Sequence, residues 1–176
     1  MNQLGLVGEK VLLRQKTLSD VEDDYLWRSD PELAELDAAN PLEMNLSDYT
    51  RFFEDEIRFE NPWSIRFAID SVQGLHIGNC MFYDINYVNG KTELGILIGD
   101  RNYWSKGYGT EAVGLLLKYI FSFTPLKSVY LHTLDWNIRA QSSFKKCGFV
   151  PIMNVHRSGK SFILMEVTKE AWMESL

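Results

Sequence analysis

The sequence predicts a single-domain α/β (α+β) protein with a mixed, mostly antiparallel sheet of about seven strands and helices on both faces of the sheet. Three observations lead to this fold class. The chain has 176 residues, of which 45% are hydrophobic, and this is enough for one packed core. Alternating apolar segments with hairpin signals indicate antiparallel strands. A glycine-rich segment also joins an apolar strand to an amphipathic helix, and no linker or repeat divides residues 1–176.

The first third of the chain is expected to be mainly helical after one opening strand, residues 11–17. The Ser-Asp pair at 19–20 is a helix N-cap signal, and Glu22 stands where it could complete a capping box. An Asp-Pro pair at 30–31 interrupts this helix, because the residue before proline disfavours helical backbone. Two further helical segments are expected, 32–36 and 47–57.

The remainder of the chain alternates strands with two helices. The Asn-Gly pair at 89–90 is a type I′ hairpin signal, and Gly148 fits the position that closes a helix. A second hairpin is expected at the Ser-Gly pair, 158–159. The expected strands are 64–70, 76–85, 91–98, 128–134, 149–156 and 161–167, and the expected helices are 107–121 and 137–147.

Composition excludes several classes of protein. The net charge is -6, with -9 carried by residues 1–62 and +3 by residues 63–176. An acidic front half disfavours nucleic acid as a partner and attracts cations, although a solvated helix surface would have the same composition. No apolar run is long enough for a membrane span, and the N-terminus lacks a signal-peptide profile, so a cytoplasmic location is expected. Cys80, Cys147 and the three histidines form no metal-ligand pattern, so no metal is expected.

Gly107 and Gly109 define the most informative segment of the chain. Glycine at both positions allows a sharp turn and a close approach by a ligand, and the helix that follows presents free N–H groups and a positive dipole end. Residues 107–112 also fit the dinucleotide fingerprint G-x-G-x-x-A, with Asp135 after the next strand. Against a dinucleotide site, residues 100–106 separate the first glycine from its strand, and the motif comes late in the chain.

Two motifs resemble the GNAT (general N-acetyltransferase) superfamily, and more closely its ribosomal-protein alanine N-acetyltransferase-like (RimJ/RimL-type) branch. The superfamily signature Gln/Arg-x-x-Gly-x-Gly/Ala is represented by residues 104–109, Trp-Ser-Lys-Gly-Tyr-Gly, in which only the first position departs. The branch commonly has an aromatic residue there. Residues 137–140, Asn-Ile-Arg-Ala, and 144–149, Phe-Lys-Lys-Cys-Gly-Phe, match the second family motif.

This resemblance implies the acyl-CoA N-acyltransferase type of fold and acetyl-CoA as the co-substrate. It places acceptor-side helices at about 19–61 and the acetyl-CoA-binding core at about 91–150. Backbone N–H groups at 105–110 would bind the pyrophosphate, and the strand 93–98 would pair with the pantetheine arm, with a bulge that Gly95 and Gly99 permit. The residues implied to contact the cofactor are Leu97, Ile98, Trp104, Ser105, Lys106, Gly107, Tyr108, Gly109, Thr110, Asn137 and Phe144.

The catalytic groups are less clearly marked in the sequence. Glu93 occupies the place where several relatives carry a general base, but a strand carboxylate in an ion pair would look the same. Asn137 is implied to bind pantetheine amides, and it also suits a helix N-cap. Phe144 stands where relatives often carry a tyrosine that protonates the thiolate. Ser142, Ser143 or water would therefore have to supply that proton.

The acceptor is expected to be a primary amine that receives the acetyl group directly. The acidic segments 20–24 and 54–60 lie where the superfamily builds its acceptor site, which favours a small cationic amine or a peptide N-terminus. The aromatic residues that could line this cleft are Trp27, Trp63, Tyr83 and Tyr87. A non-catalytic CoA-binding regulatory module of the same fold remains an alternative, and a homodimer is one expected assembly.

Overall fold

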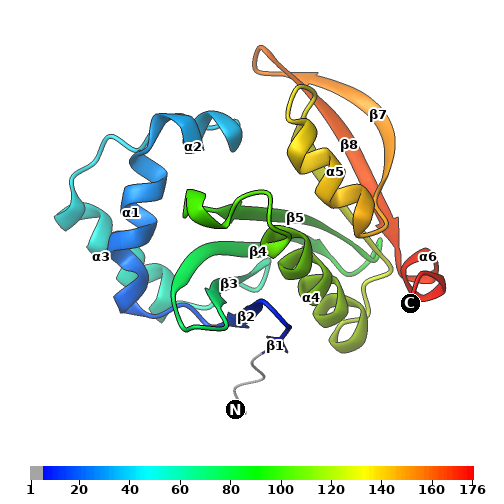
Figure 1. The fold of residues 1–176 in the computed structure, drawn as a ribbon, viewed down its shortest axis with the longest axis horizontal. Helices are drawn as coiled ribbons and strands as arrows, with labels where there is room; N and C mark the ends of the chain where they lie inside the picture. The colour runs from blue at the N-terminus through cyan, green and yellow to red at the C-terminus, as the bar shows by residue number, and fades with distance from the viewer. Residues whose placement is uncertain (1–5) are drawn as a thin grey trace.

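The structure is a computed structural model that describes residues 6–176. One sheet has the strand order β1-β2-β3-β4-β5-β6-β8-β7, and only the β5–β6 pair is parallel. Its strands are β1 (Leu6–Val7), β2 (Val11–Arg14), β3 (Ser64–Ser71), β4 (His76–Asn86), β5 (Lys91–Ile98), β6 (Ser128–Leu134), β7 (Val150–Arg157) and β8 (Lys160–Thr168). The α-helices are α1 (Val21–Ser29), α2 (Pro31–Leu36), α3 (Leu46–Arg58), α4 (Tyr108–Phe123), α5 (Ile138–Lys146) and α6 (Lys169–Glu174) (Figure 1).

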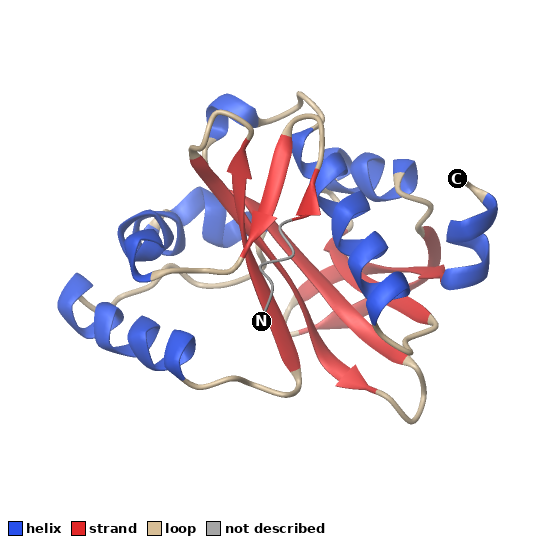
Figure 2. Ribbon diagram, turned by 90° about the horizontal axis from the view of Figure 1, so that it is seen from below, coloured by secondary structure: helices blue, strands red, loops and turns tan. Residues whose placement is uncertain are grey.

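Helices cover both faces of this sheet, as the sequence predicts (Figure 2). On one face Phe67 of β3 and Phe82 of β4 pack against Tyr119 of α4, with ring centroids 5.3 and 6.1 Å away. Side chains alternate along a strand, so their neighbours face the opposite layer. There Asn79 of β4 donates a hydrogen bond of 2.6 Å to Asp24 of α1. The apolar core thus lies under α4, and a polar layer lies under α1.

Local capping explains where several helices begin. The chain turns helical at Leu18, two residues earlier than an N-cap at Ser19 implies, because Thr17 is the N-cap and the Asp20 carboxylate accepts the N–H of Thr17 at 2.8 Å. Asp30 caps α2 by accepting the N–H groups of its first turn, and Asn45 caps α3 in the same way. Two elements were not predicted. They are β1, which has only two residues, and α6, which follows directly on β8.

The two hairpin signals behave differently. The link between β4 and β5 is a four-residue loop, 87–90, in which Gly90 has a φ of 67°. Asn89 lacks the positive φ that a type I′ turn requires, so the turn expected at 89–90 is wrong in type. Ser158 and Gly159 have φ values of 51° and 74°, and they form the two-residue turn between β7 and β8.

The polar layer under α1 holds a buried network of charges. The Arg14 guanidinium binds Asp20 at 2.7 Å and Asp70 at 2.6 Å. Burial opposes the charged form of Asp20, but the hydrogen bonds from Arg14 and Thr17 outweigh burial and hold the pKa of that carboxyl below its usual range. Arg14 therefore joins β2 and β3 to the start of α1. No helix within residues 6–176 is both long and apolar enough to cross a membrane.

Candidate active site between β5 and β6

The strands β5 and β6 form a fork. They pair only where Lys91–Glu93 runs beside Ser128–Tyr130, although β5 continues to Ile98 and β6 to Leu134. Beyond Glu93 the two strands separate, and a cavity of about 790 Å³ opens between them. Both strands line this cavity, β5 with residues 93–98 and β6 with residues 131–134. Backbone groups of β5 that face the fork are therefore available to a ligand.

The glycine-rich segment closes one part of this cavity. Gly107 is the N-cap of α4 and has a φ of 88°, which an L side chain rarely adopts. Gly107, Gly109 and Thr110 line the cavity. N–H groups in the first turn of a helix have no acceptor within the helix, and the dipole favours negative charge there. This is an anion-binding geometry at the edge of the fork.

Trp104 connects this segment to β5. Its indole N–H donates to the carbonyl of Ile98 at 2.7 Å, and the Arg139 guanidinium lies 3.8 Å from the centre of its ring. Ser105, next along the chain, has a φ of 59° and also lines the cavity. Lys106 instead turns back, and its ammonium donates to the carbonyl of Asn102 at 2.7 Å. Lys106 thus does not contribute to the cavity lining.

Tyr108 lies beside this part of the cavity. Its ring packs edge-on against Tyr103, with centroids 4.8 Å apart. Tyr103 is among the lining residues and Tyr108 is not. Tyr108 therefore supports the wall of the cavity from behind.

Glu93 lies at the apex of the fork, where the pairing of β5 and β6 ends. Its Oε1 is 2.7 Å from Nδ1 of His132, two residues beyond the last paired residue of β6. The side chains are only 9% and 13% exposed, and both residues line the cavity. In the tautomer that carries its proton on Nδ1, His132 donates this hydrogen bond to the carboxylate. Nε2 is then the ring nitrogen that can accept a proton. This pair could take up a proton.

Tyr83 of β4 stands opposite Glu93 in the sheet and also lines the cavity. Burial, followed by the negative charge of Glu93, raises the pKa of Tyr83 well above its usual value. Its hydroxyl therefore stays protonated at neutral pH. The charges of Asp84 and Asp37 act on the pKa of Tyr83 in the same direction, and of these two carboxylates Asp37 lines the cavity.

The irregularity of the β4–β5 pair lies in β4. Register shifts between Tyr83 and Asn86, and Asp84 has a φ of 49°. β5 pairs with β4 without interruption from Glu93 to Ile98, so the prediction of a bulge within 93–98 is wrong for this pair of strands. A bulge on the neighbouring strand bends the chain beside Glu93 instead.

Helix α5 forms the other wall of the cavity. The Oδ1 atom of Asn137 accepts the N–H of Ala140 at 3.2 Å, so Asn137 is the N-cap of α5 and lines the cavity as well. The Ser143 hydroxyl shares a hydrogen bond of 2.7 Å with that of Thr110, whereas Ser142 is exposed. Both serines line the cavity.

Phe144 is the buried residue of α5 that lines the cavity. Its ring packs against Phe149, with centroids 5.8 Å apart. Nearby, burial raises the pKa of Cys147 to about 11, and it raises the pKa of the fully buried Cys80 further. Both cysteines are therefore thiols at neutral pH. Among residues 6–176, no group of His, Cys, Asp and Glu side chains is placed to hold a metal ion.

The acceptor-side helices reach the cavity through α2 and the loop after it, residues 33–40. Of the four aromatics considered for this side, Tyr83 lines the cavity. Trp27 packs against His76, with ring centroids 4.8 Å apart, and Trp63 and Tyr87 are exposed outside the lining.

Comparison with known proteins identifies this arrangement. Residues 10–150 match the family model described as an acetyltransferase (GNAT) domain. The chain belongs to this GNAT family. An uncharacterized N-acetyltransferase, p20 of Bacillus licheniformis, is 32% identical over an alignment of 136 residues that covers 70% of this chain and 70% of that protein. This GNAT protein is an acetyl-CoA-dependent N-acetyltransferase, as its sequence predicts.

Solved structures share its fold. A crystal structure of spermidine N-acetyltransferase from Vibrio cholerae in complex with CoA and spermine superposes with a TM-score of 0.83 at 19% identity, over 94% of this chain and 99% of that chain. The aminoglycoside acetyltransferase AAC(6')-Ib in complex with coenzyme A gives a TM-score of 0.77 at 20% identity, over 94% and 98%. The predicted fold class is confirmed, with eight strands in place of about seven.

His132 is the site residue that sequence reasoning missed. In the sequence this histidine fits no metal-ligand pattern, but it alternates with buried residues along β6 and so faces the same side as Glu93. The contact depends on the parallel register of β5 and β6. Segments so far apart in sequence reveal this register only once the sheet is known.

Proposed function

We propose that this acetyltransferase transfers an acetyl group directly from acetyl-CoA to a primary amine of a small polycationic acceptor, and that the Glu93–His132 pair takes up the proton. The observation that carries the proposal is the hydrogen bond of 2.7 Å between these side chains at the apex of the fork. A buried carboxylate–imidazole pair open to a cavity is suited to general-base catalysis near neutral pH.

In this proposal acetyl-CoA lies in the fork in one direction. The first-turn N–H groups of α4 offer a site for the pyrophosphate, and the unpaired edge of β5 at 95–98 offers partners for the pantetheine amides. Following that edge from the α4 side leads to Glu93. The thioester would then lie beside the pair that accepts the proton, which is the orientation that direct transfer requires.

The chemistry balances with these groups. The ammonium of the acceptor gives one proton to the Glu93–His132 pair, and the free amine attacks the thioester carbonyl carbon. A C–N bond forms, and the C–S bond breaks as the thiolate leaves. The nitrogen then loses its second proton to become the amide, and water in the open cavity beside exposed Ser142 relays that proton to the thiolate.

The charge around Tyr83 supports a cationic acceptor. Glu93 and Asp37 both line the cavity with Tyr83, Glu93 from β5 and Asp37 from the loop after α2, and both raise the pKa of the Tyr83 hydroxyl. An acceptor with two ammonium groups could place one at Glu93 and the other at Asp37. The resemblance to the ribosomal-protein alanine branch makes a basic peptide N-terminus the competing acceptor.

Thiol release from acetyl-CoA tests the proposal with four amines: a polyamine, an aminoglycoside, a basic peptide and an uncharged primary amine of similar size. We expect the highest kcat/KM for the polyamine. Added salt should lower kcat/KM more steeply for the polyamine than for the uncharged amine. Equal salt dependence for charged and uncharged amines would contradict the cationic acceptor. CoA binding without turnover of any amine would instead favour the non-catalytic module.

A further inference from the structure

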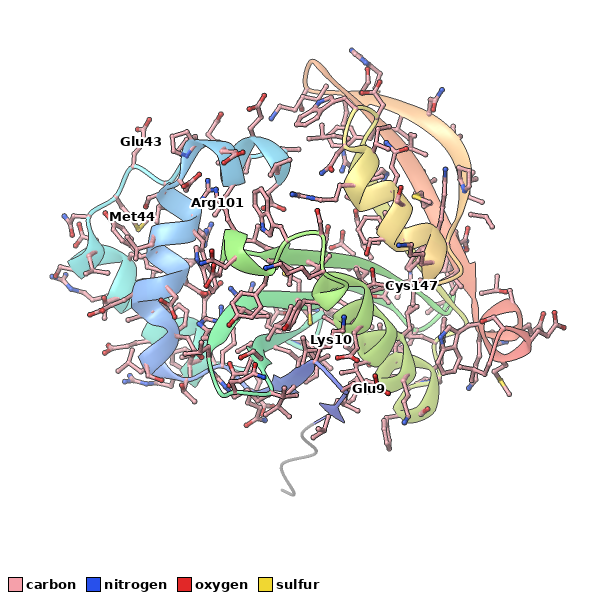
Figure 3. The ribbon with its side chains drawn as sticks, in the orientation of Figure 1. Glu9, Lys10, Glu43, Met44, Arg101 and Cys147 are labelled. Carbon is pink, nitrogen blue, oxygen red and sulfur yellow. The ribbon has the colours of Figure 1, made fainter. Side chains whose placement is uncertain are left out.

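The carboxylate of Glu111 binds an element far away in sequence. Glu111 lies in the first turn of α4, and it accepts hydrogen bonds from three consecutive backbone N–H groups in the turn between β1 and β2. The N–H of Glu9 donates at 3.0 Å, and those of Lys10 and Val11 donate at 2.8 Å each. Figure 3 shows Glu9 and Lys10 beside α4. Successive N–H groups of this kind form an anion-binding nest.

The sequence is shaped to allow this contact. A Cβ atom on Gly8 would come within 2.6 Å of Oε2 of Glu111, so a side chain at position 8 would displace the carboxylate. The N–H of Gly8 also donates to the carbonyl of Val11 at 2.8 Å, which closes the turn that aligns the three donors. Hydrogen bonds to an ionised acceptor are about twice as strong as neutral ones.

The direction of the Glu111 side chain matters for the cofactor. A carboxylate in the first turn of a helix is attracted to that helix's own free N–H groups. Glu111 is turned onto the β1–β2 turn instead, and α4 has no side-chain cap. The first-turn N–H groups at 108–110 therefore remain open to an anionic ligand.

Lys10 holds the other end of the same segment. Its ammonium donates to the carbonyl of Lys106 at 2.7 Å, and it lies 3.3 Å from where a Cβ of Gly107 would be. One turn, residues 8–11, therefore binds the chain both immediately before Gly107 and four residues after it. Gly107 has a left-handed φ of 88°, and the two attachments hold this backbone in place.

We propose that Glu111 is a positioning residue for acetyl-CoA, which fixes the pyrophosphate-binding segment 106–111 through the β1–β2 turn. The proposal rests on the use of acetyl-CoA and not on the identity of the acceptor. A segment ordered before binding loses less conformational entropy when the cofactor binds. Glu111 would thus affect the binding of the pyrophosphate part of acetyl-CoA, and other residues would act on the thioester.

Two acetyl donors test this role in Glu111→Gln. Acetyl-CoA carries the pyrophosphate, and S-acetyl-pantetheine lacks it. We expect the KM for acetyl-CoA to rise about 10-fold with kcat nearly unchanged. The reason is that the Gln amide would turn an N–H group toward one of the backbone N–H groups that the carboxylate binds. The kcat/KM for S-acetyl-pantetheine should stay within about 2-fold of the wild type, since that donor does not reach the segment.

Matched controls separate positioning from general damage. Glu170→Gln makes the same change at an exposed position in the first turn of α6, and it should leave both donors unaffected. Lys10→Met removes the second attachment and should also raise the KM for acetyl-CoA, whereas Lys118→Met, at an exposed position of α4, should not.

Two results would overturn the role. They are equal losses with both donors, and a folded Glu111→Gln enzyme with an unchanged KM for acetyl-CoA. If the wild type turns over no amine, calorimetric CoA affinities of the same variants still decide the question. The failure of the proposed function and the failure of this inference are therefore distinguishable.

Discussion

Trp27 lies directly over Gly99, and a Cβ atom on Gly99 would overlap the indole ring. Gly99 is the first residue after β5, and its N–H donates to the carbonyl of Ile77 at 2.9 Å. The contact therefore joins α1, on the acceptor side, to the start of the segment that leads into α4. Neither residue lines the cavity, so any effect on activity must pass through their packing.

Gly99→Ala tests that contact. We expect the free energy of unfolding to fall by about 2 kcal/mol, because the extra methyl group forces Trp27 out of its site. The KM for acetyl-CoA should also rise. Urea unfolding and steady-state kinetics measure the two effects. Gly114→Ala is the control, since nothing lies within 4 Å of a Cβ there and alanine favours helix, and it should be neutral or stabilising.

The Glu93–His132 pair predicts a shared catalytic effect. Glu93→Gln and His132→Gln should each lower kcat about 100-fold or more with a smaller change in KM, because each removes general-base catalysis. The double variant should be little worse than the more severe single one, since residues that act as a unit are not additive. Fully additive losses would mean that the two side chains act separately. His156→Gln, at an exposed position of β7, should retain full activity.

Asp37 predicts a change in acceptor preference. Asp37→Asn should raise the KM for a polyamine about 10-fold at low salt and leave that for an uncharged amine unaltered, because it removes one carboxylate from the acceptor end of the cavity. The difference should shrink as salt is added. Asp48→Asn, at an exposed position of α3 outside the acidic segments 20–24 and 54–60, is the matched control. A similar rise in KM for both amines would show that Asp37 does not recognise charge.

Asp20 predicts acid destabilisation. Its pKa is lowered in the folded state, so its contribution to stability is present above the unfolded value, about 4, and is lost as the pH falls through the folded value. Urea unfolding should show a steady decline below about pH 4. Asp20→Asn should cost about 2 kcal/mol at neutral pH, because Arg14 loses a charged partner, and it should flatten the decline. An unchanged acid profile in this variant would assign the decline to other carboxyls.

Much of the fold could be predicted because its signals are local. Strand β6 was predicted with its exact bounds, and Gly148 closes α5 with a φ of 92°. The glycine-rich segment was placed correctly, since a strand, two glycines and an apolar helix are all read within a short window. Helix starts were shifted by one or two residues where an earlier polar residue, such as Asn45, supplied the cap.

The contacts that complete the site are not local. His132 meets Glu93 only because β5 and β6 are parallel, and Glu111 meets the turn at 8–11 only because α4 crosses the sheet near β2. Side-chain type at these positions gives no signal of its own. A strand histidine and a helix glutamate are both ordinary residues until the register and the packing of the sheet are known.

The fork leaves the sheet with an incomplete seam. Strands β1 to β5 are joined to β6, β8 and β7 by three residue pairs, 91–93 with 128–130. Beyond these pairs β5 and β6 are not paired with each other. The extended pantetheine arm of the cofactor would lie in the gap and form backbone hydrogen bonds along it. Binding of the cofactor would then make the connection between strands β1 to β5 and strands β6, β8 and β7 more rigid. Amide hydrogens of 95–98 should exchange with solvent more slowly once CoA is bound. Acetyl-CoA would then stabilise the sheet as well as supply the acetyl group.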